Sequence, residues 1–198
     1  EYLRPYYERD VVAGILDDEE AVFHLACLLV KETHYMQLGG PAPDGRDLTS
    51  RVSFLVLEAA HRLRIPCNIA VRVHDGLDPE LFDRAVEYLF DDKTGNPNWM
   101  GSPALDEGFA RNGYPIELAR QRVKCGCHWC ALPGREYTLN DIVKINFAAV
   151  FDVALRDMMG DSNVTPSVNE LWNRFEKHLR RAVEVVAQGI DFHLATYK

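Results

Sequence analysis

The sequence predicts an α/β fold, a layered sheet or a barrel, that is rich in helices and has few short strands. Apolar residues recur at helical spacing over most of the 198 residues. The strand candidates number three or four, are short, and lie between the helices. Such alternation is typical of α/β layers and barrels. No repeat, low-complexity tract or linker interrupts the pattern, so residues 1–198 are expected to form a single structural unit.

Helices are predicted wherever apolar residues return every three or four positions. The predicted helical ranges are residues 8–31 (one helix or a pair), 50–63, 79–91, 102–112, 115–120, 141–158 and 167–197. The helix over 50–63 is apolar around much of its circumference and should be well buried. Gly189 is a candidate interruption of the last helix.

Strands are predicted at 34–38, 68–74, 98–101 and 122–124. The range 68–74 is the clearest, because its β-branched residues alternate with others. Alternation places Arg72 and His74 on one face of that strand. Two interpretations stay open for them: they line a polar cavity and bind substrate, or they form a satisfied structural pair.

Composition and charge narrow the class of protein. Apolar residues make up 47% and charged residues 26%, which is ordinary for a globular chain. A net charge of -8 argues against a general nucleic-acid surface. No apolar run reaches the roughly 18 residues of a membrane span, and the N-terminal residues do not resemble a signal peptide. The five cysteines do not have the spacing of a secreted disulfide scaffold, so a cytoplasmic location is expected.

The segment Lys124-Cys125-Gly126-Cys127-His128-Trp129-Cys130 is the most distinctive in the chain. It permits three interpretations. Cys125, Cys127, His128 and Cys130 are soft ligands suited to zinc or an iron–sulfur cluster, but no second cysteine pair follows. Cys127 and Cys130 form a C-x-x-C pair typical of dithiol redox proteins, but Pro133-Gly134 does not continue a helix. The third interpretation is a single reactive cysteine on a loop fed by a strand.

An ordered series of motifs runs through about 160 residues of the chain. Its segments are Gly39-Gly40 with Asp44-Gly45-Arg46-Asp47, Leu55 to Ala59, Pro66 to His74, Gly113-Tyr114-Pro115 with Glu117 to Arg120, Gly126-Cys127, and Pro133 to Tyr137 with Asp141. This series resembles the glycyl radical enzymes of the pyruvate formate-lyase-like, dehydratase-like group. The resemblance implies that the chain is a helix-rich part of a ten-stranded α/β barrel.

The resemblance also implies a function. Cys127 falls where the family has its thiyl-forming cysteine, which takes a hydrogen atom from a small organic substrate so that a C–C or C–heteroatom bond is cleaved. Asp141 falls where dehydratase-like members have an Asp that faces the substrate, although it can also be read as a helix-start acid. Cys125 and Cys130 are expected to be small packing residues.

Two departures from the family pattern matter. Trp129 stands where the family usually has a Glu for acid–base work. Either His128 is the proton donor instead or the reaction needs no proton there, and Trp129 is a candidate wall for the substrate. The family's R-V-x-G-Y glycyl loop is not found. The glycyl radical is therefore expected from a segment not in this chain, with no cofactor or metal bound directly. The chain is expected to be an inactive fragment of a longer or split enzyme. Its expected partners are the rest of the enzyme, a radical-SAM activating enzyme and a second copy in a homodimer.

Overall fold

The computed structural model describes residues 2–32, 35–126, 129–136 and 144–196. They divide into two compact units, Glu1–Thr138 and Leu139–Lys198. The sequence pattern, in contrast, predicts a single unit. The connecting residues 137–143 lie outside the described residues. Whether the two units form one domain of the complete protein stays a prediction.

A three-stranded parallel sheet forms the centre of the first unit. Its order is β1 (Met36–Gly39), β2 (Ile69–Val73), β3 (Asn98–Gly101). Helix α3 (Arg51–Leu63) connects the first pair of strands and α4 (Pro79–Asp92) connects the second. Parallel neighbours require such crossovers. These three strands and two helices were all predicted, and their bounds differ from the predictions by two residues or fewer.

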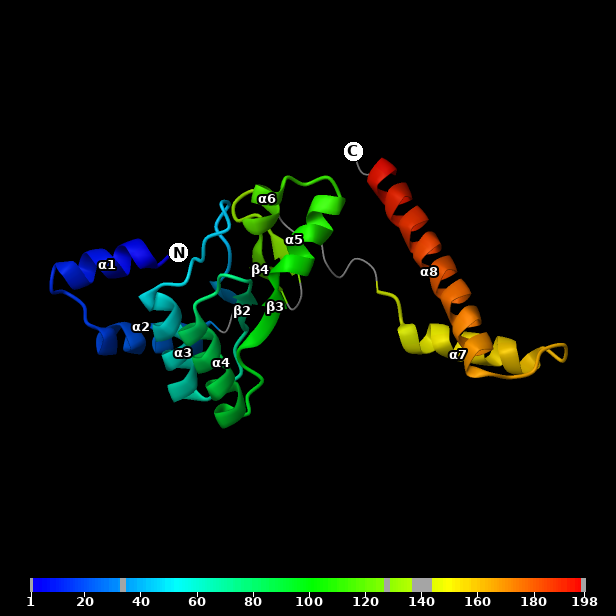
Figure 1. The fold of residues 1–198 in the computed structure, drawn as a ribbon, viewed down its shortest axis with the longest axis horizontal. Helices are drawn as coiled ribbons and strands as arrows, with labels where there is room; N and C mark the ends of the chain where they lie inside the picture. Colours follow the sequence, from blue (N-terminus) through cyan, green and yellow to red (C-terminus); the bar gives the residue numbers. More distant parts are fainter. Residues whose placement is uncertain (1, 33–34, 127–128, 137–143, 197–198) are drawn as a thin grey trace. The chain divides into compact units, whose positions relative to one another are not determined.

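One face of this sheet is covered by helices. Ile69 and Val71 of β2 are fully buried and pack against apolar side chains of α3, α4 and α2 (Asp18–Lys31). Figure 1 shows these three helices grouped on one side of the strands. Side chains alternate across a strand, so Ala70 and Arg72 face the opposite side. That opposite face holds the candidate site.

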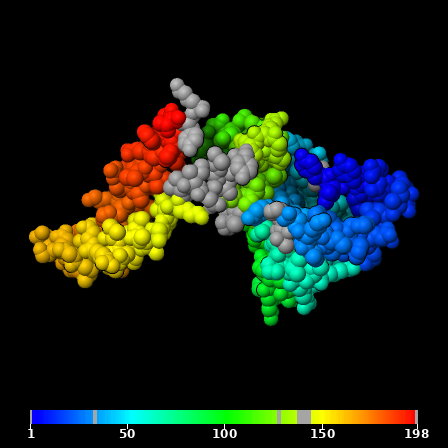
Figure 2. All heavy atoms as spheres, turned by 180° about the vertical axis from the view of Figure 1, so that it is seen from behind, coloured from blue at the N-terminus to red at the C-terminus, as the bar shows by residue number. Residues whose placement is uncertain are grey.

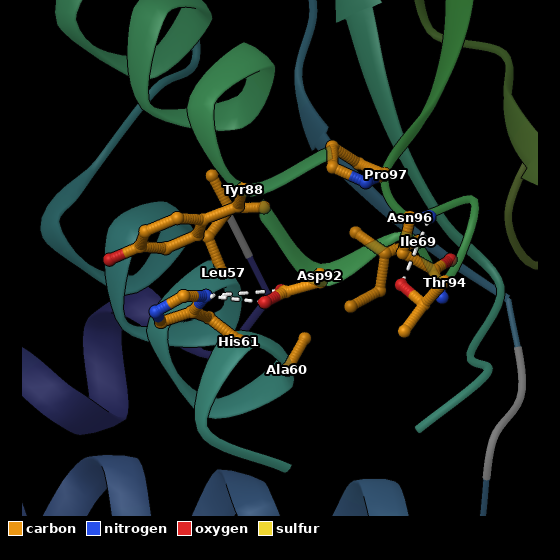
Figure 3. A pocket seen from close by; sticks show the side chains of 9 residues that line it. All are labelled: Leu57, Ala60, His61, Ile69, Tyr88, Asp92, Thr94, Asn96 and Pro97. Atoms are coloured by element: carbon orange, nitrogen blue, oxygen red, sulfur yellow. Dashed lines mark hydrogen bonds and ion pairs between the residues drawn. The ribbon is translucent and has the colours of Figure 1, made fainter. Parts of the chain in front are cut away.

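The contact between α3 and α4 includes a polar cluster around a small void. The rings of His61 and Tyr88 stack with centroids 3.8 Å apart, and His61 Nδ1 lies 2.9 Å from Asp92 Oδ1 (Figure 3). The hydroxyl of Tyr88 donates to Glu58 at 2.6 Å. The enclosed volume is ≈ 10 Å³, which is room for about one water molecule. This void therefore serves packing and is too small for a substrate.

The N-terminal region forms the predicted pair of helices. Helix α1 (Arg4–Val12) precedes α2, whose first turn is capped by the Asp17 carboxylate accepting from the Glu20 N–H at 2.9 Å. Val12 and Ile15 belong to the apolar residues that recur at helical spacing in 8–31, but their exposed fractions are 90% and 70%. No residue of α1, which is fully described, is buried, and the helix lies at the surface (Figure 2, dark blue).

An antiparallel hairpin carries the cysteine segment. It consists of β4 (Val123–Cys125) and β5 (Trp129–Ala131), and it follows α5 (Ser102–Arg111) and α6 (Ile116–Arg120). β4 corresponds to the predicted strand 122–124. β5 was not predicted, because three residues are too few to show alternation. It forms through pairing with β4 and burial of Cys130 and Ala131.

The second unit is a pair of helices, α7 (Phe147–Gly160) and α8 (Val168–Thr196). Helix α7 begins at Phe147, later than predicted, because the Asn146 side chain caps it by accepting from the Ala149 N–H at 3.1 Å. Gly189 does not interrupt α8. None of the described helices is long and apolar enough to cross a membrane.

Candidate functional site

The cysteine hairpin lies on the face of the sheet that the helices leave uncovered. Each strand of the sheet contacts it. Gln37 of β1 accepts from the Lys124 N–H at 3.0 Å, and Asn98 of β3 accepts from Lys124 Nζ at 2.6 Å. Arg72 of β2 donates to the carbonyl oxygen of Arg122, next to β4. These contacts fix the stem of the hairpin on the face of the sheet opposite helices α2, α3 and α4.

Arg72 is fully buried beneath the hairpin. Its side chain forms an ion pair with Asp106, which also accepts from the Ser102 hydroxyl at 2.7 Å. The five acceptors of its guanidinium are the Ser102 hydroxyl, the Asp106 carboxylate, and the carbonyl oxygens of Ala119, Arg120 and Arg122. A guanidinium has five N–H donors, so all are used inside the protein. This supports the structural interpretation of Arg72, and substrate binding by Arg72 stays a prediction without support from its contacts.

Arg122 holds the base of the hairpin from the other side. Its guanidinium carbon lies 4.0 Å from the ring centroid of Phe109 and 4.4 Å from that of Tyr114. It pairs with both carboxylate oxygens of Glu136, at 2.7 and 2.8 Å, and donates to the Cys130 carbonyl at 3.2 Å. Cation–π contact and bidentate pairing both favour Arg here. Arg122 directly precedes β4 and donates to a carbonyl of β5, so this one residue holds the two strands of the hairpin together.

The two described cysteines of the hairpin lie on opposite faces of it. Cys125 pairs with Trp129, and Cys130 pairs with Lys124. Directly paired residues share a face, so Cys130 faces the sheet, with Sγ 3.6 Å from Met100 Sδ, and Cys125 faces away with Trp129. Burial raises the pKa of the Cys130 thiol, which disfavours the reactive thiolate. The packing role expected for Cys130 is confirmed, and that expected for Cys125, which is half-buried, stays a prediction.

The hairpin geometry bears on the metal interpretation. Within the described ranges no group of three or more His, Cys, Asp or Glu side chains is arranged to hold a metal ion. Cys125 and Cys130 face opposite ways, so they are poorly placed to share one ion. Cys127 and His128, the other two candidate ligands, lie outside the described residues.

A cavity of ≈ 360 Å³ adjoins the hairpin. Its lining comes from the hairpin region (Val123, Lys124 and Pro133), from β1 and the start of α3, and from Tyr2, Leu3, Tyr35 and Leu48. Most lining side chains are apolar, with Gln37 and Ser53 among the polar ones. A volume in this range suits a small organic molecule.

His74 closes the carboxyl end of β2. Its Nδ1 accepts from the Gly76 N–H at 3.3 Å, so the proton of the neutral ring is on Nε2, which lies 2.9 Å from Asp47 Oδ1. The second oxygen of Asp47 accepts from the Asp78 N–H at 3.2 Å. His74 therefore links two loops, although it also lines a second cavity of ≈ 370 Å³. Its substrate-binding role stays a prediction.

Asp47→Asn should show a pH-dependent loss of stability. Burial raises the pKa of Asp47, but the hydrogen bonds around it, including those from His74 and Asp78, lower it more, so the net pKa is below its usual value. Its contribution to stability is therefore present above the unfolded-state value of about 3.9 and is lost as the pH falls through the folded-state pKa. Urea unfolding should show a deficit for Asp47→Asn at pH 7 that shrinks below about pH 4. A deficit that is constant with pH would contradict this.

The remaining predicted site residues have different outcomes. Trp129 is half-buried on β5, facing away from the sheet, and its role as a substrate wall stays a prediction. Cys127, His128 and Asp141 lie outside the described residues. Sequence reasoning missed Lys124, Arg122 and Asp106 as supports of the hairpin. The available signal was charge next to the cysteine segment, at Arg122 and Lys124 of a strand-like run.

These features define an α/β protein in which a cysteine hairpin lies on one face of a parallel sheet and helices cover the other face. The family model described as pyruvate formate lyase-like matches residues 1–197. The chain belongs to this family. Curated proteins similar to it include the 4-hydroxyphenylacetate decarboxylase glycyl radical subunit of Clostridium scatologenes, which is 27% identical over 63% of this chain and 17% of its own length.

Known proteins resemble the chain over most of its length. The isethionate sulfite-lyase of Bilophila wadsworthia is 26% identical, over 90% of this chain and 26% of its own. The trans-4-hydroxy-L-proline dehydratase of Clostridioides difficile is 25% identical, over 96% of this chain and 28% of its own. The chain thus spans about a quarter of the length of these relatives.

Solved structures agree on the fold. A structure described under 1,2-propanediol dehydration in Roseburia inulinivorans has a TM-score of 0.77 at 22% identity, over 92% of this chain and 27% of its own. The structure of a glycyl radical enzyme from Archaeoglobus fulgidus has a TM-score of 0.76 at 22% sequence identity, over 95% of this chain and 28% of its own. The predicted helix-rich α/β class with few short strands is confirmed. The ten-stranded barrel stays a prediction, because the described residues contain only three strands of the parallel sheet.

Proposed function

We propose that the chain is the cysteine-loop portion of a glycyl radical enzyme that cleaves a C–C or C–heteroatom bond through a thiyl radical on Cys127. The observation that carries the proposal is the position of the hairpin. Lys124 before Cys127 and Cys130 after it contact the face of the sheet opposite the helices, and a cavity of ≈ 360 Å³ adjoins Lys124. A radical cysteine needs such a site, since water and oxygen must be kept away from it.

The proposed chemistry is a relay of hydrogen atoms. The Cys127 thiol gives its hydrogen atom to a glycyl radical in another part of the complete protein, so that an S–H bond breaks and a C–H bond forms. The Cys127 sulfur then takes a hydrogen atom from a carbon of the substrate. The substrate radical loses its leaving group, and the product radical takes the hydrogen atom back from Cys127. No external oxidant or reductant is consumed in this cycle.

We assign the other predicted residues supporting roles in this cycle. His128 supplies or accepts a proton at the leaving group, in place of the Glu that Trp129 replaces. Trp129, Asp141 and His74 contact the substrate or its surroundings. We assign Arg72 to holding the hairpin, because its five donors are used within the protein.

The substrate and partners follow from the family. The relatives include a sulfite-lyase, dehydratases and a decarboxylase, so a small organic molecule with a leaving group is proposed. The complete protein would work as a cytoplasmic homodimer and would need a radical-SAM activating enzyme.

The test is anaerobic activation of the complete protein that contains this segment, with a radical-SAM activating enzyme. We expect an organic radical signal in electron paramagnetic resonance that appears only after activation and disappears in air. Elemental analysis of the same sample should show no stoichiometric zinc or iron. A bound metal that is lost in both Cys125→Ser and Cys130→Ser, without any organic radical, would contradict the proposal and favour a metal-binding module.

A further inference from the structure

The side chain of Lys124 is buried between the hairpin and the sheet. The residue is 5% exposed, and its Nζ donates to Asn98 Oδ1 at 2.6 Å. Its backbone N–H donates to Gln37 Oε1 at 3.0 Å. Burying an ammonium group costs free energy unless hydrogen bonds replace its water. This lysine therefore binds β1 and β3 at once, through two different groups.

Lys124 is well placed to set the position of the hairpin tip. It precedes Cys127 by three residues, on a strand where each residue advances by roughly 3.3 Å. Arg72 fixes the neighbouring carbonyl at Arg122. The entering strand is thus held at two positions, 122 and 124. Of these two, Lys124 is the nearer to the cysteine.

We propose that Lys124 is a positioning residue that fixes the distance between the Cys127 sulfur and the groups with which it exchanges hydrogen. This inference rests on the proposed function. Hydrogen-atom transfer requires reacting atoms about 3–3.5 Å apart, and a misplacement of about 1 Å can cost 10²-fold in rate. Loss of the Nζ–Asn98 bond removes the side-chain contact that holds the entering strand against β3.

The experiment replaces the ammonium with an apolar group of similar length, Lys124→Met, in the complete activated protein. We expect kcat to fall at least about tenfold while KM changes less than about threefold. The radical yield after activation should match the wild type. Exchange of the glycyl radical hydrogen with D₂O, which the proposed relay routes through Cys127, should slow in parallel with kcat. Lys31→Met, at the exposed end of α2, is the matched control and should change none of these.

A second variant isolates the same contact. Asn98→Ala removes only the acceptor and should reproduce the loss of kcat. The double variant Lys124→Met/Asn98→Ala should lose no more than the worse single variant, because both remove one interaction. If Lys124→Met does not fold, Asn98→Ala and its exchange rate provide the test.

Two results would overturn the inference. One is a kcat within about twofold of the wild type in folded Lys124→Met or Asn98→Ala. The other is a loss of kcat that follows radical yield and thermal stability, which indicates general disruption. If Cys127→Ala itself keeps turnover, the proposed function fails. If Cys127→Ala loses turnover and the two contact variants do not, only the positioning role fails.

Discussion

Cys127→Ala in the complete activated enzyme is expected to lose turnover by more than about a thousandfold, the scale seen when a bond-forming side chain is removed. Alanine has no S–H bond, so it can neither receive the radical nor take hydrogen from the substrate. The radical signal should still form on activation, because activation does not use this sulfur. Product formation per radical, measured anaerobically, is the quantity to compare.

Cys130→Ala is the matched control for this substitution. It removes a thiol from the same hairpin, but that thiol is buried against Met100 and its pKa is raised by burial. We expect turnover per radical to fall by less than about tenfold, through repacking alone. A Cys127→Ala enzyme that keeps turnover within tenfold of the wild type would contradict the thiyl mechanism.

Arg72→Leu is expected to produce the largest loss of stability in the chain. It leaves the Asp106 carboxylate, 7% exposed, without its cation, and removes the donor of five hydrogen bonds. Removing one partner of a buried ion pair typically costs about 3–5 kcal/mol. Urea unfolding of the 198-residue chain, followed by circular dichroism, measures the free energy of unfolding.

Two further variants make that result interpretable. Arg72→Leu/Asp106→Leu should recover much of the loss, since no isolated charge is then buried. Arg62→Met removes an exposed arginine that pairs with Glu19 and Glu58, and should have a much smaller effect. If Arg72→Leu is no more destabilising than Arg62→Met, the buried network is not what holds the hairpin on the sheet.

The sequence was sufficient to predict most of the sheet and its helices. The alternation in 68–74 and the helical spacing in 50–63 are local patterns, and the structure confirms both as β2 and α3. The strand β5 was missed because only its pairing with β4 defines it. The exposure of Val12 and Ile15 was missed because periodicity identifies an apolar face but not whether another element covers it.

The candidate site was predictable only in part. The cysteine segment was recognisable because three cysteines, a His and a Trp rarely occur together within six residues. The supports of that segment were not, since Arg72 meets Asp106 from 34 residues away and Lys124 meets Gln37 from 87 residues away. Such contacts depend on how β1, β2 and β3 assemble. The sequence alone therefore left both interpretations of Arg72 open, and the five acceptors in the structure support the structural one.

The most direct test of the central claim follows hydrogen exchange through the sulfur of Cys127. The activated enzyme is transferred to D₂O, and the hydrogen splitting of the glycyl radical signal is recorded over time. A thiol exchanges its hydrogen with solvent, so relay through Cys127 predicts that the splitting collapses in the wild type and in Cys130→Ala but persists in Cys127→Ala. Exchange at the wild-type rate in Cys127→Ala would contradict the account.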